Sequence, residues 1–313
     1  MGIVLEQEQK GFTIIEVMLF LALSGFLMVG ILAGTGSSIA NQRYNDAVQD
    51  AVDALRGAYS FVADTQVAER DGGEGACKGL DKDDDNQFRG RTGCAVYGAM
   101  VTIDGARMQI STVIGYDYRD FLRAAEEAAN NKNKNKNNDL PEGYSDVISP
   151  ASDKDLLKAL NVNNIVCQGA DKCSVTEGLK ERTLKWDTIF KAPRVGEETK
   201  TKDLKLALLI YRHPINGSIR TLSYSYTNTE GVVDYSTANN LSENSGIKSI
   251  LEKMEQKDVA LCVDSNGAES YANHRRIIKI AKNTHSQRGV ILTNMDEDVY
   301  INGEEVAICD DQE

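Results

Sequence analysis

The sequence predicts an α+β fold, in which a long N-terminal hydrophobic helix packs on an antiparallel β-sheet head with a helix-rich insertion. Three observations indicate this architecture. An apolar run extends from Phe12 to Ala33, an amphipathic helical pattern follows it to about residue 70, and short β-rich segments separated by turn signals occupy much of the rest. We therefore expect the apolar helix at 12–33, its amphipathic continuation at 34–70 and a globular head at 71–313.

The apolar run is long enough to cross a membrane. Its 22 residues would form about 33 Å of helix, and a hydrocarbon core requires about 20 apolar residues. Between Phe12 and Gln42, Glu16 is the only ionisable side chain. Because an unpaired charge in hydrocarbon is costly and is rarely present without a function, Glu16 predicts a partner of opposite charge.

Two simpler interpretations of the run are a cleaved secretory signal and a plain membrane anchor. A secretory signal normally begins with a positive region, whereas Glu6 and Glu8 outweigh Lys10 before this run. A plain anchor explains the length but leaves Glu16 without a partner. A lipoprotein anchor is excluded because no cysteine lies near the end of the run.

The segment from residue 34 to about residue 70 is predicted to continue the helix. Its apolar residues are spaced by 4, 3, 4 and 3 positions and form a seam on one helical face: Val48, Val52, Leu55, Tyr59 and Val62. We expect this seam to face the core of the head. A glycine cluster at 72–75 predicts the end of the helix.

The head is predicted from its strand and turn patterns. Asp104-Gly105 and Asn216-Gly217 are hairpin signals. They lie between expected strands at 95–103 and 107–114, and at 204–212 and 218–227. Further strands are expected at 259–263, 276–281, 289–293 and 305–309.

Helices are expected in the head at 116–129, 152–160, 174–190 and 243–256. The first three indicate a helix-rich insertion at 117–200. Within it, residues 130–139 (NNKNKNKNND) are polar and of low complexity, too hydrophilic to pack in a core.

Composition disfavours two classes of function. The net charge of −12 argues against broad nucleic-acid binding, which requires a basic surface, and leaves room only for a local patch. The catalytic patterns GxSxG, HExxH, the Walker loop and the dinucleotide fingerprint are absent from the sequence. Its three histidines, at 213, 274 and 285, are isolated from one another. We therefore expect no enzymatic activity.

All six cysteines follow residue 70: Cys77, Cys94, Cys167, Cys173, Cys262 and Cys309. An even number in an exported domain indicates disulfides. Sequence cannot determine their connectivity, but proximity favours pairing each cysteine with its nearest neighbour, which gives 77–94, 167–173 and 262–309. A zinc site is disfavoured because the sequence lacks paired CxxC knuckles.

An acidic segment provides a candidate calcium site. Asp81, Asp83 and Asp85 have the i, i+2, i+4 spacing of an EF-hand-type loop. However, Thr92 occupies the position of the usual bidentate glutamate. Both a calcium loop completed by another segment and a solvated acidic loop are compatible with this pattern.

Residues 10–17 (KGFTIIEV) resemble the processing site of type IV pilins and of the pseudopilins of type II secretion. The resemblance implies that residues 1–11 are a leader, which a membrane prepilin peptidase removes after Gly11. It further implies that the new amino group of Phe12 is methylated and that Glu16 pairs with the Phe12 amine of a neighbouring subunit during assembly. It covers only residues 10 to about 40.

The same resemblance implies partners and a location. The partners are other pilin or pseudopilin subunits, the prepilin peptidase, an inner-membrane assembly platform and, before assembly, membrane lipid. The protein would first be a single-pass membrane protein with an extracytoplasmic head, and then part of an extracellular pilus or pseudopilus. The bulk of the head favours a minor or tip-proximal subunit. The alternative is a membrane-tethered binding protein or adhesin that does not polymerise.

Overall fold

The computed structural model describes residues 13–64, 94–119, 122–123, 126, 150, 152–160, 162–164, 180–193, 202–225, 247–265, 276–284, 287–294, 299–301, 304–306 and 309. The chain forms two units, Met1–Asp46 and Ala47–Glu313. Together, the long N-terminal helix and the antiparallel sheets of the second unit confirm the predicted α+β class.

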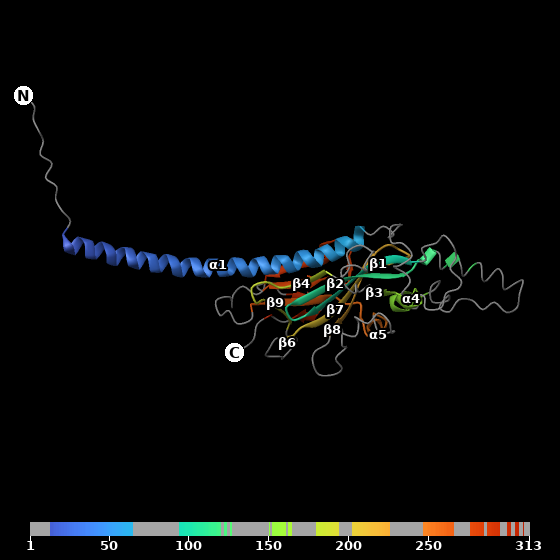
Figure 1. Cartoon of the computed structure of the whole chain (residues 1–313). Helices are drawn as coiled ribbons and strands as arrows, with labels where there is room; N and C mark the ends of the chain where they lie inside the picture. The colour runs from blue at the N-terminus through green and yellow to red at the C-terminus, as the bar shows by residue number, and fades with distance from the viewer. Residues whose placement is uncertain are drawn as a thin grey trace, which may run out of the picture. The chain divides into compact units, whose positions relative to one another are not determined.

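Helix α1, Ile14–Asp64, is a single helix of 51 residues (Figure 1). No proline interrupts it, and its apolar part is rich in leucine, methionine and alanine, which favour helix. The seam predicted between Val48 and Val62 is buried: its five side chains are at most 1% exposed. The core-facing side of the helix was therefore predicted correctly.

The second unit contains two antiparallel sheets. In the described part of the chain, sheet A has the strand order β11-β8-β7-β1-β2-β3, and β4 also pairs with β2. Its strands are β1 Cys94–Asp104, β2 Arg107–Tyr116, β3 Asn163–Asn164, β4 Lys180–Thr183, β7 Lys205–Arg212, β8 Ile219–Ser225 and β11 Asn283–Thr284. The two predicted hairpins are thus confirmed, with Gly105 and Gly217 at positive φ in their loops.

Sheet B has the order β12-β10-β9-β5-β6. Its strands are β5 Ile189–Ala192, β6 Lys202–Asp203, β9 Val259–Asp264, β10 Arg276–Ile280 and β12 Val290–Asn294. A short 3₁₀ turn, η3 Gln287–Gly289, precedes β12, and β13 Val299–Ile301 pairs with β14 Glu304–Val306 in a separate hairpin. The predicted closing strands at 259–263, 276–281 and 289–293 are therefore confirmed. The strand predicted at 305–309 overlaps β14, and residues 307–308 lie outside the described residues.

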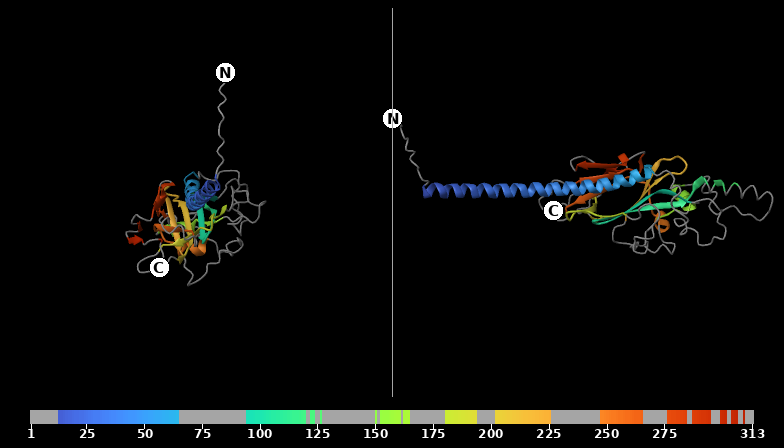
Figure 2. Two further views of the ribbon diagram at one scale, coloured as in Figure 1. Left: turned by 90° about the vertical axis from the view of Figure 1, so that its left-hand side faces the viewer. Right: turned by 45° about the horizontal axis from the view of Figure 1, so that its top comes forward.

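Strand β7, which lies between β8 and β1 in sheet A, is buried on both faces; Figure 2 gives two further views of the sheets and α1. Along β7, the side chains of Ala207, Leu209 and Tyr211 belong to a hydrophobic cluster with residues of α4 Asp153–Ala159 and α5 Ile247–Leu251. The alternate side chains point to the other face, where the Tyr59 hydroxyl of α1 reaches Thr221 of β8. This double burial explains why β7 reads as a nearly continuous apolar run rather than as an alternating pattern.

The predicted helix at 174–190 is wrong over its described part. Residues 180–183 form β4, which pairs with β2, and Ile189 begins β5. The sequence KER at 180–182 favours helix, but as a strand it covers the outer edge of β2, which would otherwise leave backbone groups unpaired. Long-range pairing therefore overrides the local preference here.

The other predicted helices have different bounds from those expected. The helix at 152–160 is confirmed as α4, with Ser152 as its N-cap. Residues 118–119, 122–123 and 126 are helical, whereas Tyr116 still belongs to β2. Helix α5 ends at Leu251, because Glu255 exchanges two backbone hydrogen bonds of 2.8 Å with Ser223. Residues 130–139 lie outside the described residues.

Candidate functional site

The start of α1 carries a capping box between Thr13 and Glu16. The Thr13 backbone amide donates to Glu16 Oε2 over 3.0 Å, and the Thr13 hydroxyl donates to the same oxygen over 3.2 Å. In return, the Glu16 backbone amide donates to Thr13 Oγ1 over 3.3 Å. This reciprocal arrangement satisfies backbone donors that the first turn of a helix leaves unpaired.

The box holds the Glu16 carboxylate beside the beginning of the helix. Oε2 accepts both hydrogen bonds from Thr13, whereas Oε1 accepts none from the described residues. One carboxylate oxygen is therefore positioned and the other remains available. The negative charge also lies at the positive end of the helix dipole. The sequence analysis missed Thr13, although the signal was present as T-x-x-E at residues 13–16.

The hydroxyl side chains of Ser24, within the apolar run, and of Thr35, just after it, bond to their own helix. The Ser24 hydroxyl donates to the Leu21 carbonyl over 3.1 Å, and the Thr35 hydroxyl donates to the Ile31 carbonyl over 3.0 Å. Such local bonds are how hydroxyl groups are accommodated in apolar helices. Glu16 thus differs from the other polar residues of the segment, because its carboxylate retains unused acceptor capacity.

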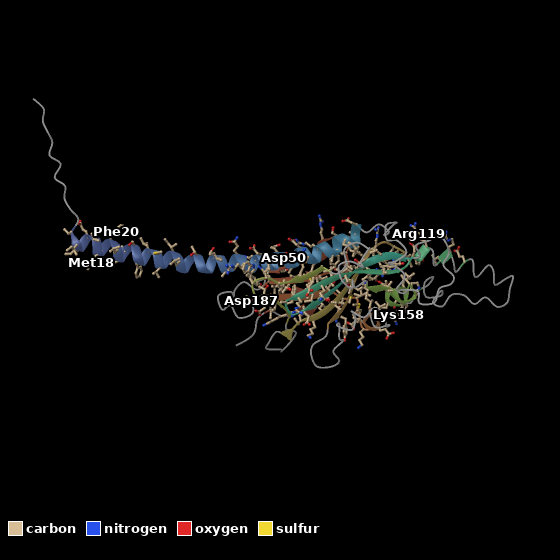
Figure 3. The ribbon with its side chains drawn as sticks, viewed as in Figure 1. Met18, Phe20, Asp50, Arg119, Lys158 and Asp187 are labelled. Carbon is tan, nitrogen blue, oxygen red and sulfur yellow. A yellow bond between two sulfur atoms is a disulfide. The ribbon has the colours of Figure 1, made fainter. Side chains whose placement is uncertain are left out.

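The large apolar side chains of the same helical segment are exposed. Ile14 is 79% exposed and Phe26 is 84% exposed, and Figure 3 shows Met18 and Phe20 projecting from the helix. By length and composition, α1 contains a segment able to cross a membrane. Exposure of this many large apolar side chains is unfavourable in water, so the segment requires lipid or protein around it.

Residues 7–32 match the family model for the prokaryotic N-terminal methylation motif. The chain has a pilin-type N-terminus. The match and the apolar helix support membrane anchoring, with the rest of the chain extracytoplasmic. No curated protein and no solved structure matches the chain. The functional assignment therefore depends on the N-terminal motif and on the geometry around Glu16.

Several of the other predicted site residues lie outside the part of the chain that the structure describes. The processing residues Gly11 and Phe12 lie outside the described residues, as do the candidate calcium ligands Asp81, Asp83 and Asp85. Among the described residues, no group of three or more histidine, cysteine or acidic side chains is arranged to hold a metal ion.

Cys262 and Cys309 form a disulfide, the pairing that proximity favoured. Their Cα atoms are 5.5 Å apart, and the bond joins β9 to the C-terminal segment across 47 positions. Both cysteines are buried with Ala260 and Ile277. Cys94 begins β1, and the remaining three cysteines lie outside the described residues.

His213 is the one histidine in the described part of the chain. Its Nδ1 accepts hydrogen bonds from the amides of Ile215 and Asn216, at 3.3 and 3.5 Å. Its Nε2 lies 3.7 Å from Asp153 Oδ1. Burial and the nearby Arg220 lower the pKa of His213, and Asp153 opposes them only in part. Since Nδ1 is already an acceptor for backbone amides, this histidine is not arranged as a general base.

Proposed function

We propose that the protein is a structural subunit of a type IV pilus or pseudopilus, processed by a prepilin peptidase and assembled through its N-terminal helix. The observation that carries the proposal is the Glu16 carboxylate: one oxygen is held by Thr13, and the other has no donor among the described residues. Cleavage after Gly11 would create a cationic amine at Phe12. A neighbouring copy or related subunit could then supply the charge that Glu16 lacks.

The free energy of the Glu16 carboxylate should be lower in an assembled filament than in a single subunit in the membrane. A carboxylate in hydrocarbon is costly, and a nearby amine that can donate a hydrogen bond favours its charged form. Docking a subunit so that the Phe12 amine reaches Glu16 Oε1 removes that cost and fixes the axial register. The exposed apolar side chains of the same helix would pack against other helices in the filament core.

The head supports a minor subunit rather than the main repeating one. About 250 residues follow α1, a large head for a thin filament. We propose that a few adjacent copies enter each filament, with the heads exposed on its surface and available for contacts with surfaces or other cells. The inner-membrane assembly platform and membrane lipid are its partners before assembly.

Replacing Glu16 tests this function. In cells that assemble the filament, Glu16→Ala should still be cut after Gly11 but should enter sheared filaments poorly. Ser24→Ala is the matched control, because its hydroxyl bonds only to its own helix turn. Filament incorporation of Glu16→Ala equal to that of the unaltered protein would contradict the assigned pairing.

Mass spectrometry of the N-terminal peptide tests the processing step. We expect a peptide that begins with methylated Phe12. A protein that retains residues 1–11 in cells would instead be a tethered binding protein or adhesin that does not polymerise.

A further inference from the structure

The only tryptophan of the chain lies on a tight turn with unfavourable backbone geometry. Trp186 and Asp187 have φ angles of 61° and 57°, and the Thr188 amide donates to the Lys185 carbonyl over 3.3 Å. Positive φ at both central residues is the geometry of a type I′ turn, which normally contains Asn-Gly or Gly-Gly. A bulky residue in this region is a genuine outlier. Strained backbone conformations of this kind occur most often at functional sites.

Hydrogen bonds on both sides hold this turn in place. The Leu184 amide donates to the Ala106 carbonyl over 2.8 Å, and the Phe190 amide donates to the Gly105 carbonyl over 3.1 Å. Thr188 is 1% exposed, whereas Trp186 is 50% exposed. The turn therefore exposes a large aromatic side chain on a backbone that hydrogen bonds hold in place. Pre-organised aromatic anchors of this kind lose little entropy when a partner binds.

A second fixed turn presents an apolar side chain at the other end of sheet A. The loop between β7 and β8 is closed by hydrogen bonds of 2.8 Å from the His213 amide to the Ser218 carbonyl and from the Gly217 amide to the His213 carbonyl. Ile215 projects from this loop and is 51% exposed. Within the described part of the head, the large apolar side chains that are exposed are Trp186, Ile215 and Ile291.

Strand register places the two turns at opposite ends of the sheet. Lys205, at the start of β7, pairs with Asp104 beside the Trp186 turn, whereas Tyr211 pairs with Gly98 near the Ile215 loop. The eight residues of β7 correspond to about 26 Å. Figure 3 likewise shows Asp187 at one end of the sheets and Lys158 of α4 at the other; Asp153 of the same helix contacts Tyr211.

The two turns also carry opposite charges. Asp187 is exposed beside Trp186, and Arg212 is exposed beside the Ile215 loop. Neither side chain forms an ion pair with another described residue. Each turn therefore combines one exposed apolar side chain with one charge that no described residue pairs, and the two charges would attract each other in a contact between copies.

We propose that the Trp186–Asp187 turn of one copy contacts the Arg212–Ile215 loop of the next copy in the filament. The proposal depends on the proposed function, because it requires copies assembled side by side. Such a contact joins two different surfaces of the same chain, so along a helical filament it can repeat from copy to copy without closing. Its apolar part is one tryptophan and one isoleucine, far below the area of a stable interface in solution. Helices already held together in the filament core supply the effective concentration that the contact needs.

Cysteine cross-linking tests the contact in filaments. The full chain would carry Asp187→Cys together with Asn216→Cys, and sheared filaments would be treated with a short bifunctional thiol reagent. We expect a ladder at multiples of the chain mass, whereas either substitution alone should give no ladder. A chain that is cut after Gly11 and enters filaments, but gives no ladder, overturns the contact alone. A chain that keeps its leader overturns the proposed function and the contact together.

Substitution of Trp186 provides an independent measurement. Trp186→Ser should reduce the amount of chain in sheared filaments several-fold, as expected for truncation of an aromatic anchor. Ile291→Ser is the matched control, because Ile291 is equally exposed but lies in sheet B. Equal incorporation of the two variants would contradict a role for Trp186.

An exchange of charges tests the pairing of Asp187 with Arg212. Asp187→Arg and Arg212→Asp should each lower incorporation, and the chain with both substitutions should regain most of it. Restoration by the second substitution is specific to a direct contact, since two independent defects would add. Additive losses would overturn the pairing.

Discussion

The hydroxyl of Tyr59 on α1 lies 2.6 Å from the hydroxyl of Thr221 on β8. Both residues are fully buried, and the Tyr59 hydroxyl also donates to the Ala281 carbonyl over 3.4 Å, just beyond β10. One side chain of the helix is therefore bonded to segments of both sheets. It links the helix whose start carries the Glu16 site to the head that would be displayed on the filament.

Removing the Tyr59 hydroxyl should destabilise the head. Tyr59→Phe leaves the Thr221 hydroxyl buried with one partner fewer, and an unsatisfied buried polar group costs about 1–3 kcal/mol. We expect a loss of this size in the free energy of unfolding, measured by urea titration of the full chain in detergent. In a Thr221→Val background the same substitution should cost much less, because the partner is already absent. An equal cost in both backgrounds would show that the hydrogen bond is not responsible.

The same environment predicts the behaviour of the head at alkaline pH. Burial raises the pKa of Tyr59 to about 12, although the bond to Thr221 lowers it and Asp258 adds to the rise. The unfolded chain loses this proton near pH 10, whereas the folded chain keeps it. Stability should therefore be unaffected by Tyr59 below about pH 10 and fall as the pH rises from about 10 to about 12. Tyr59→Phe should weaken this dependence in unfolding titrations.

Asp153 connects α4 to sheet A through two strands. Its Oδ2 accepts from the Tyr211 hydroxyl of β7, and its Oδ1 accepts from Arg220 Nη1 of β8. The carboxylate is 18% exposed and the Arg220 side chain is 22% exposed, so water screens the pair only in part. These bonds hold α4 over the hydrophobic cluster that contains Leu156 and Leu157.

Asp153→Asn should lower the free energy of unfolding by about 2 kcal/mol or more, because it leaves a partly buried guanidinium without its charge partner. Glu252→Gln is the control, since it removes the exposed ion pair with Lys158 on the same face of the molecule and should change stability little. Urea unfolding of the two variants provides the comparison. Similar midpoints would mean that Asp153 does not hold α4 in place.

His213 makes the head sensitive to mild acid. Its pKa is lowered in the folded chain, first by burial and then by Arg220, so the unfolded chain takes up a proton at a higher pH than the folded chain does. Stability contributed by neutral His213 is therefore present above about pH 6.5 and is lost as the pH falls below that value. His213→Gln should flatten the dependence of the melting temperature on pH between about 7 and 5. An unchanged pH profile would assign the effect to other groups.

Local signals in the sequence were sufficient to predict α1, its buried seam and the two hairpins of sheet A. Val48 to Val62 repeats with helical periodicity, and Gly105 and Gly217 adopt the positive φ that their loops require. The strand β4 could not be predicted in this way, because it is determined by the free edge of β2, about 70 residues earlier in the chain. The hydrogen bonds of Asp153 with Tyr211 and Arg220 could not be predicted from local sequence either, because these residues lie 58 and 67 positions away.

The same contrast applies to the candidate sites. The Glu16 position was predictable because its motif is contiguous, and Thr13 could have been recognised from the capping-box spacing. The Trp186 turn could not be predicted, because its positive φ angles are seen only in the folded backbone. The local pattern of residues 174–190 predicts a helix at that position instead.

The close approach of β1 and β7 at Gly98 provides the last prediction. A Cβ atom at this position would lie 2.7 Å from the Tyr211 Cα atom, a contact with backbone that cannot move aside. The ladder between β1 and β2 is also irregular between Val96 and Gly98. Gly98→Ala should therefore separate the two central strands of sheet A and lower the melting temperature strongly.

Gly57→Ala is the matched control for this substitution. A Cβ atom at Gly57 would meet nothing within 4 Å, and Gly57 lies inside α1, where alanine is favoured over glycine by roughly 1 kcal/mol. The same chemical change should thus stabilise the protein at one position and destabilise it at the other. Thermal unfolding of the two variants in parallel measures the difference. A Gly98→Ala protein as stable as the unaltered chain would show that β1 and β7 do not approach each other this closely.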